Sequence, residues 1–194
     1  MIIEYTTVST TLGMIGLAQS ARGLVATTLP QASEKAAIAR LYSTLCRFHA
    51  TAAKTQLERF EPLATWLRQY ASGQKVSFPV ELDMMCWTDF QRRVWNATKL
   101  IPYGETRSYS WVARAAGAPA ARQATGQALH HNSFPLVIPC HRVIGANGAL
   151  TGFGEGLEMK RKLLTLEGIK DYCVRQHATC CLSAQQPVAV QARR

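Results

Sequence analysis

The chain changes character near its midpoint, and that change limits the folds it can adopt. Residues 1–85 carry eight Lys or Arg and six Asp or Glu, a net charge of +2, whereas residues 86–194 carry fourteen and six, a net charge of +8. A basic half with ordinary core composition is the electrostatic footprint of a polyanion partner, because each phosphate that Lys or Arg neutralises releases counterions. The alternative is a charge that only keeps the protein in solution.

The boundary between the halves is marked by the polar, turn-rich run Ala71–Lys75 and lies near residues 72–86. A chain of 194 residues suits two small domains that share an interface, and 47% hydrophobic residues are enough to bury a core in each. We expect a structural domain at 1–80, a second domain at 86–170 and a tail of unknown role at 171–194.

The first half has the pattern of a small sheet with helices. Two apolar runs, residues 13–19 and 24–29, flank a turn at residues 21–23, as in a hairpin. From Glu34 to about Lys54 the apolar residues recur at helical spacing, and residues 57–70 continue the pattern. This order predicts an α+β domain.

The second half has the pattern of a mainly helical domain. Thr88 and Asp89 are suited to cap a helix at residues 90–100, and residues 106–109 are short and extended. The apolar run at residues 134–138 predicts a buried strand immediately before Pro139 and Cys140.

The pattern of residues 110–132 indicates two further short helices that form a helix-turn-helix. Ser110 is expected to cap the first, which stops at Gly117, and the second runs from residue 118 to Asn132 after a Gly-Ala-Pro turn. The second helix is rich in small residues, including Ala124, as a helix laid deep in a DNA groove would need. The alternative is an ordinary Ala-rich helix packed in a core.

The dipeptide Cys140-His141 is a candidate nucleophile with its base. A thiolate is the reactive form of cysteine, and a neighbouring imidazole steered by a carboxylate promotes its formation. The alternative is a buried, inert cysteine.

The remaining cysteines give no site that we can assign. Cys46, Cys86, Cys173, Cys180 and Cys181 are irregularly spaced, and in a reducing cytosol all are expected to be thiols. Cys180-Cys181 with His177 and Cys46 with His49 are weak metal signatures, and we predict no metal and no cofactor. The N-terminus lacks a secretory signal and no run of eighteen apolar residues occurs, so we expect a cytoplasmic protein without membrane association.

The segment Pro139–Val143 resembles the active-site signature of the O6-alkylguanine-DNA alkyltransferases. Residues 90–117 and 147–168 resemble the same family in order and spacing, so the resemblance covers roughly Phe90 to Gly168. It implies a ribonuclease-H-like first domain and a second domain with a winged helix-turn-helix. It also implies repair by direct, stoichiometric and irreversible transfer of an alkyl group from O6 of guanine in DNA to the protein's own cysteine, with O4-alkylthymine as a second candidate substrate.

The resemblance also implies residue roles. Cys140 is the alkyl acceptor, His141 its base, and Glu167 the carboxylate that orients His141. Asn132 is the hinge asparagine, and Tyr109 rotates the target phosphodiester and donates a proton to the departing guanine.

Further residues are implied to contact the extruded nucleotide. The carbonyls of Cys140 and Val143 accept from the guanine amino group, and Phe153 and Gly154 belong to the pocket. The expected partner of this monomer is duplex DNA carrying alkylated guanine, bound with little sequence preference and with the damaged base extruded from the stack.

Two departures from the family pattern matter. The family's arginine finger aligns with Gln123, and an arginine stands one position earlier at Arg122, so either residue is a candidate to fill the gap left by the base. The pocket tyrosine is replaced by Phe153, which keeps a wall for stacking and lacks the hydroxyl. Glu155 stands at a pocket-rim position whose size tunes tolerance of bulky alkyl groups.

Three rival interpretations were weighed. A non-catalytic alkyltransferase-like lesion binder would lack Cys140. A winged-helix transcription regulator would use Cys140 for redox sensing or for packing. A cysteine hydrolase would need an oxyanion hole, and no motif in the sequence indicates one.

Overall fold

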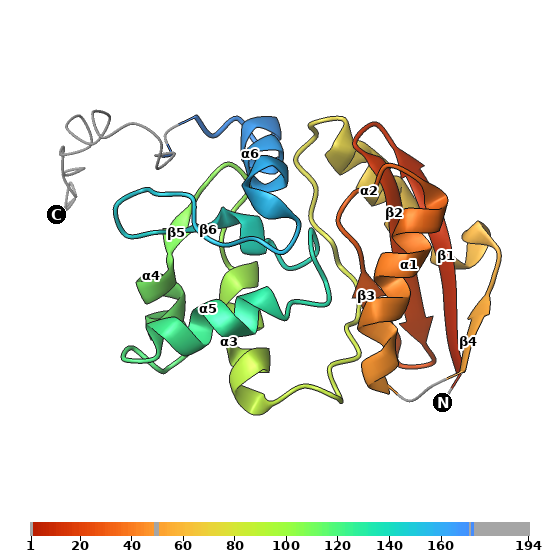
Figure 1. Cartoon of the computed structure of the whole chain (residues 1–194), viewed down its shortest axis with the longest axis horizontal. Coiled ribbons are helices and arrows are strands. Elements are labelled where there is room, and N and C mark those ends of the chain that lie inside the picture. The colour runs from red at the N-terminus through yellow and green to blue at the C-terminus, as the bar shows by residue number, and fades with distance from the viewer. Residues whose placement is uncertain (1, 49–50, 171, 173–194) are drawn as a thin grey trace, which may run out of the picture.

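The computed structural model describes residues 2–48, 51–170 and 172, and within them the chain forms a small mixed sheet with helices followed by a mainly helical part. The two parts lie side by side, with the sheet at the right and the helical part at the left of Figure 1. The α+β class predicted from the sequence is confirmed. Most of the predicted tail, including Cys173, His177, Cys180 and Cys181, lies outside the described residues, as does His49.

The sheet has four strands in the order β3-β2-β1-β4. The expected hairpin is present as β2 (Gly13–Ser20) and β3 (Gly23–Thr27), and β1 (Ile2–Thr10) pairs antiparallel with β2. Helix α1 (Glu34–Leu45) begins at the N-cap Ser33, whose side chain accepts from the backbone NH of Ala36, and packs mainly against β2.

The prediction of one helix from Glu34 to about Lys54 is wrong beyond Leu45. A single 3-10 turn, η1 (Cys46–Phe48), follows α1, and β4 (Thr51–Lys54) then pairs parallel with β1. The pattern at 57–70 also divides, into the 3-10 turn η2 (Leu57–Phe60) and α2 (Leu63–Ala71), because Pro62 stands at the N-cap.

The helical part begins with α3 (Asp89–Lys99), where Thr88 forms a capping box with Gln91. Two parallel two-residue strands, β5 (Arg107–Ser108) and β6 (Val143–Ile144), lie beside the helices, and α6 (Gly156–Leu166) closes the described fold.

Helices α4 (Tyr109–Ala115) and α5 (Arg122–His130) follow one another as two short helices in contact. The N-cap of α4 is Ser108 rather than the predicted Ser110, since the Ser108 hydroxyl accepts from the NH of Trp111. Helix α5 starts four residues later than predicted because residues 118–121 form the turn that joins the two helices.

The predicted strand at residues 134–138 is wrong. The segment is buried, as its composition indicated, but it turns back on itself through a bridge between Pro135 and Ile138, with Leu136 at a φ of 73°. It is followed by the 3-10 turn η3 (Cys140–Arg142), which carries the candidate nucleophile.

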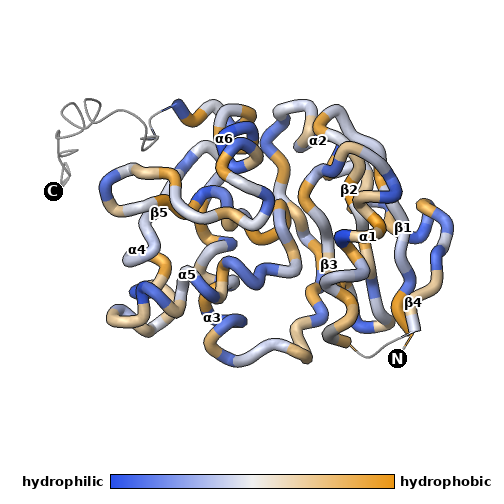
Figure 2. Tube along the Cα trace, in the orientation of Figure 1, coloured by the Kyte–Doolittle hydropathy of each residue, from blue (hydrophilic) through white to orange (hydrophobic). Residues whose placement is uncertain are grey.

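One hydrophobic cluster runs through both parts of the chain, from Ile3 and Val8 in the sheet to Trp95 and Leu163 in the helices. Figure 2 likewise shows hydrophobic segments in both parts. The division into domains at 1–80 and 86–170 stays a prediction. In the described part of the chain, no helix is long and apolar enough to cross a membrane.

The segment that joins the two parts covers the edge of β3. Leu24 donates its NH to the carbonyl of Glu81 at 2.9 Å and accepts from the NH of Asp83 at 2.8 Å. Gly23 has a φ of 140°, and a Cβ there would stand 2.6 Å from the Glu81 oxygen, so the close approach requires glycine. This pairing satisfies backbone groups that an open edge would expose.

The other contact that positions the site is made by Thr27 at the end of β3. Its NH donates to the Ser133 carbonyl at 2.8 Å, and its hydroxyl donates to the buried Pro135 carbonyl at 2.7 Å. The sheet therefore holds the segment that leads into Cys140.

We expect Thr27→Val to destabilise the protein by about 1–3 kcal/mol, because it leaves the buried Pro135 carbonyl without its donor. Urea unfolding measures the change. The matched control is Thr125→Val, since the Thr125 hydroxyl is buried without a hydrogen-bond partner among the described residues and its removal should be neutral or stabilising. Equal destabilisation by both substitutions would contradict this role for Thr27.

Candidate active site

Cys140 lines a cavity of about 60 Å³ between the two parts of the chain. Four other predicted site residues line the same cavity: Tyr109, Asn132, Phe153 and Gly154. The cavity is small beside ligand pockets of roughly 300–1,000 Å³. The space beside the Cys140 sulfur is therefore narrow in this structure.

An ion pair joins opposite walls at this cavity. Nε of Arg40 on α1 donates to Oε1 of Glu155 at 2.5 Å, and both residues line the cavity. Such a partly exposed pair contributes only about 0–1 kcal/mol, so it opens at little cost. The predicted rim residue Glu155 is thus held by the first half of the chain.

Asn132 holds the cysteine from the end of α5. Its amide nitrogen donates to Sγ of Cys140 at 3.2 Å and to the Ile138 carbonyl at 3.0 Å, while its amide oxygen accepts from the NH of Phe134 at 2.9 Å. One side chain therefore fixes both ends of the turn before the nucleophile.

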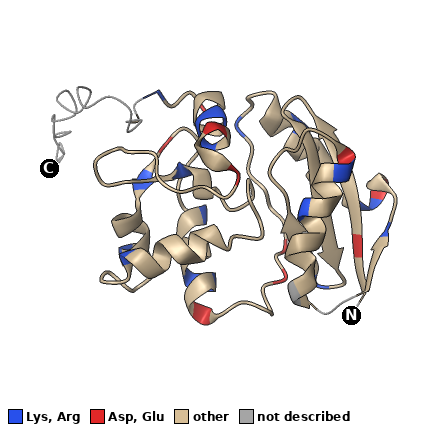
Figure 3. Cartoon of the chain, viewed as in Figure 1, with Lys and Arg blue, Asp and Glu red and all other residues tan. Residues whose placement is uncertain are grey.

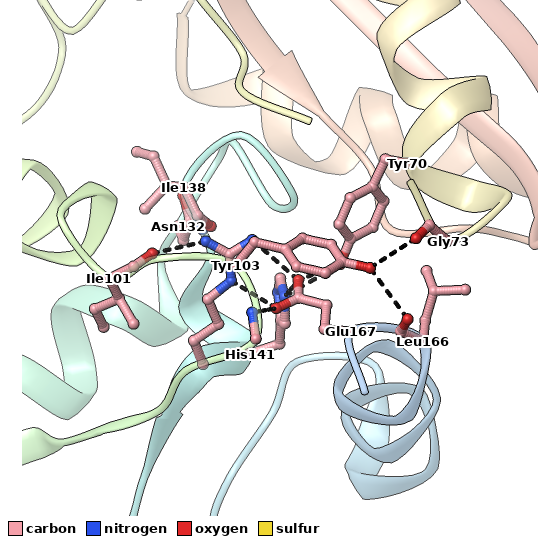
Figure 4. A network of polar contacts seen from close by, with 11 residues as sticks. Tyr70, Gly73, Ile101, Tyr103, Asn132, Ile138, His141, Leu166 and Glu167 are labelled. Carbon is pink, nitrogen blue, oxygen red and sulfur yellow. Dashed lines mark hydrogen bonds and ion pairs between the residues drawn. The ribbon is translucent and has the colours of Figure 1, made fainter. Parts of the chain in front are cut away.

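Behind Cys140 lies a buried polar network centred on Glu167, the residue that follows α6 (Figure 4). Glu167 Oε1 accepts from His141 Nε2 at 2.8 Å and from the Tyr70 hydroxyl at 2.7 Å. Arg142 donates to both carboxylate oxygens, at 2.9 and 3.0 Å, and the NH of Gly104 donates to Oε2 at 3.2 Å. The carboxylate thus has donors from three different segments of the chain: α2, the residue Gly104 and η3.

The charge state of Glu167 follows from these donors. Burial alone would raise the pKa of Glu167, but the hydrogen bonds and charges of His141 and Arg142 outweigh it and bring the pKa to about 2. Burial lowers the pKa of His141, and Glu167 offsets part of that effect. Near neutral pH the pair is therefore a carboxylate beside a neutral imidazole.

The tautomer of His141 follows as well. An ionised carboxylate only accepts hydrogen bonds, so the proton of the neutral ring lies on Nε2, which faces Glu167. Nδ1 then carries a lone pair, and it is buried without a hydrogen-bond partner among the described residues. The ring presents a basic nitrogen on the side away from Glu167.

Lys160 is a charged residue of this site to which the sequence pattern alone gave no role. It is fully buried, and its ammonium donates to the carbonyls of Val143 at 2.6 Å and Thr151 at 3.0 Å. The ammonium also lies 6.0 Å from the ring centre of Tyr109 and 5.9 Å from that of Phe153. Burial lowers the pKa of Lys160 to about 8, and the charge of Cys140 acts in the opposite direction.

The pKa of the Cys140 thiol is shifted in opposite directions by its surroundings. Burial raises the pKa of its thiol, while the Asn132 amide and the Lys160 charge lower it. The sulfur at rest is therefore a thiol held next to groups that favour its ionised form. Burial likewise raises the pKa of Tyr109, so its hydroxyl remains a donor.

The other predicted residues lie apart from the cavity. Arg122, Gln123 and Ala124 are exposed at the start of α5. Arg122 lines a separate hollow that it shares with Tyr109 and the loop at 145–147. Val143 is buried, and its carbonyl is already bound by Lys160.

Lys and Arg residues outnumber Asp and Glu residues in the helical part, and Figure 3 shows their positions along the ribbon in blue and red. Six of these Lys and Arg residues are exposed and have no carboxylate within ion-pair distance in the described chain: Arg93, Lys99, Arg114, Arg122, Lys162 and Lys170. Their charge is available to a polyanion.

The sequence held signals for residues that it did not single out. Lys160 shares a helical face with the buried Leu163 and Leu164 and with Glu167, an unusual place for an unpaired ammonium. Tyr70 lies on the buried face of α2, where its hydroxyl needs a partner. No group of three or more His, Cys, Asp or Glu in the described residues is arranged to hold a metal ion. Cys46, Cys86 and Cys140 are free thiols.

The geometry defines a class of protein: one that buries a nucleophilic cysteine, with histidine and carboxylate behind it, beside a basic helical surface. Residues 89–169 match the family described as 6-O-methylguanine DNA methyltransferase, DNA binding domain.

Relatives extend the match to most of the chain. A methylated-DNA–protein-cysteine methyltransferase of Mycolicibacterium paratuberculosis is 42% identical over 166 residues, which are 86% of this chain and 93% of the relative. The crystal structure of the Mycobacterium tuberculosis O6-methylguanine methyltransferase aligns with a TM-score of 0.66 and 40% identity, over 85% of this chain and 92% of that one. A crystal structure of the M. tuberculosis OGT in complex with DNA has the same TM-score and identity, over 84% and 92%. The chain belongs to the methylated-DNA–protein-cysteine methyltransferase family.

We expect Lys160→Met to raise the pKa of the Cys140 thiol, because it removes a cation that favours the ionised sulfur. The pH dependence of Cys140 alkylation by iodoacetamide, followed by peptide mass spectrometry, measures that pKa. Lys162→Met, which removes an exposed charge two residues away, is the control and should leave the profile in place. A lower Cys140 pKa in Lys160→Met would contradict the argument.

Proposed function

We propose that this protein repairs alkylated DNA by moving the alkyl group from O6 of guanine to Sγ of Cys140. The observation that carries the proposal is the position of Cys140: its sulfur lines a cavity, and directly behind it stands a neutral His141 oriented by the Glu167 carboxylate. Family membership supports the same conclusion.

The reaction needs a base, a nucleophile and a proton donor. Nδ1 of His141 takes the proton of the Cys140 thiol, directly or through a water molecule that bridges the two groups. The sulfur attacks the saturated carbon on O6, the carbon–oxygen bond breaks, and its electron pair passes to guanine. Tyr109 donates a proton to N3 of the departing base and regains one from the imidazolium through solvent, so the net change is transfer of the thiol proton to guanine.

The product explains single turnover. Cys140 becomes a thioether, which is a poor leaving group, and the described cavity wall contains no second cysteine that could take the alkyl group. Each protein molecule therefore acts once, and the repair is stoichiometric and irreversible.

The substrate must be extruded from the duplex, because O6 of a stacked guanine is out of reach of a buried sulfur. Opening the Arg40–Glu155 pair would widen the cavity for the incoming base. Phe153 supplies a wall for stacking and no hydroxyl toward O6. O4-alkylthymine is a second candidate substrate of the same pocket.

We also propose that α4 and α5 form the helix-turn-helix of a winged domain, that residues 86–170 bind DNA, and that residues 1–80 form a ribonuclease-H-like structural domain. Exposed small and polar residues at the start of α5, Ala124 among them, suit a helix lying in a groove. The basic surface favours duplex DNA with little sequence preference, and we propose a monomeric cytoplasmic protein that acts without a membrane or cofactor.

Arg122 and Gln123 have different surroundings. Because Arg122 lines the hollow beside Tyr109 and Ser110, we propose that it contacts a phosphate and that Gln123 fills the gap left by the base.

The acceptor is tested by mass spectrometry after mixing the protein with duplex DNA that contains O6-methylguanine. We expect one methyl group per protein on the peptide that contains Cys140, and none in Cys140→Ser, which should still bind the DNA. Cys86→Ser, which alters an exposed cysteine, should react like the wild type. Methyl transfer by Cys140→Ser would rule out Cys140 as the acceptor.

The groove-facing helix is tested with Ala124→Phe. The added ring should weaken duplex binding by about tenfold or more, roughly 1.4 kcal/mol, while the reaction with free O6-methylguanine stays near the wild-type rate. Ala21→Phe, in an exposed turn of the first half, is the control for both measurements. Loss of both activities to the same extent would argue against a DNA-facing role for Ala124.

A further inference from the structure

The first half of the chain contributes a side chain to the polar network behind Cys140. Tyr70 lies on α2, is only 1% exposed, and packs against Phe78, Tyr103 and His141 at ring distances of 6.0, 6.2 and 6.4 Å. Its hydroxyl reaches across the interface to Glu167, 97 residues later in the chain (Figure 4).

The hydroxyl contacts both members of the His141–Glu167 pair. It donates to Glu167 Oε1 at 2.7 Å, and its oxygen lies 3.2 Å from Nε2 of His141. Since the carboxylate only accepts, Tyr70 uses its single proton on Glu167 and has lone pairs left for Nε2–H. The Tyr70 hydroxyl, Glu167 Oε1 and His141 Nε2 therefore all have a hydrogen-bond partner when His141 is protonated on Nε2.

Burial and the charge of Glu167 keep Tyr70 in its donor form, because both raise the pKa of the phenol. Tyr70 therefore stabilises the Glu167 carboxylate without adding a charge. A carboxylate that shares its oxygen with Tyr70 attracts the Nε2 proton of His141 less strongly, so imidazolium is less favoured and the ring stays a free base.

We infer that Tyr70 is a positioning residue for alkyl transfer: it shares Oε1 of Glu167 with His141 and so holds His141 in the neutral form whose Nδ1 takes the Cys140 proton. This rests on the proposed function. It also gives the first half of the chain a part in the reaction, beyond covering the helical domain.

The test is the pH dependence of methyl transfer from O6-methylguanine duplex DNA to Cys140 in Tyr70→Phe. Without the phenol the carboxylate holds the imidazolium more tightly, so the acid limb of the rate profile should move to higher pH. The shift should lower the rate on that limb by up to about tenfold, the effect of one hydrogen bond, while the rates at alkaline pH converge with the wild type.

The control is Tyr103→Phe, the same change at a hydroxyl of the same interface. The Tyr103 hydroxyl donates to the carbonyls of Gly73 and Leu166 and not to Glu167, so its loss should leave the acid limb in place. An unchanged profile in Tyr70→Phe, or a rate lowered equally at every pH, overturns the inference.

A second variant covers the case in which Tyr70→Phe does not fold. Fluorotyrosine incorporated at position 70 keeps the aromatic ring and has a hydroxyl that is a stronger hydrogen-bond donor. The acid limb of the rate profile should therefore move to lower pH. An acid limb that stays in place or moves to higher pH would contradict the positioning role of Tyr70. A wild type that gains no methyl group would instead refute the proposed function.

Discussion

A single buried carboxylate organises this protein. Glu167 accepts hydrogen bonds from Tyr70, Gly104, His141 and Arg142, and these donors come from both halves of the chain. A buried charge is tolerated only when it is paired and fully hydrogen-bonded, so folding must bring these segments together before the carboxylate is stable. The same requirement that orders the interface also fixes the ring of His141 behind the nucleophile.

The remaining fold supports that arrangement from its periphery. Thr27 at the end of β3 and Asn132 at the end of α5 hold the segment before Cys140 from two sides. Lys160 holds the segment after it through the Val143 carbonyl. Cys140 thus lies on a short turn, and the segments on either side of that turn are hydrogen-bonded to the sheet and to two helices, so the position of its sulfur is fixed. The cavity wall, in contrast, is joined only by the weak ion pair of Arg40 and Glu155.

The sequence predicted the α+β class, the hairpin and α3 because hairpin turns and helix caps are local signals. It failed where distant partners decide the conformation. Residues 51–54 become a strand because β1 offers an edge. Residues 134–138 turn, with a bridge between Pro135 and Ile138, and the Pro135 carbonyl accepts from Thr27 at the end of β3. The dipeptide Cys140-His141 was a candidate from its chemistry, and the family resemblance added Glu167 and the role of each residue. Tyr70 could not be found in that way, since its role depends on a contact across 97 residues.

The state of the His141 ring tests the account most directly. Nitrogen-15 NMR of histidine-labelled protein, with the His141 signals assigned by their loss in His141→Gln, reports which ring nitrogen carries a proton. At neutral pH the account predicts a protonated Nε2 facing Glu167 and an unprotonated Nδ1. A proton on Nδ1 would contradict it, because the lone pair of a neutral ring would then lie on Nε2, which faces Glu167, and Nδ1 could not accept the proton of Cys140.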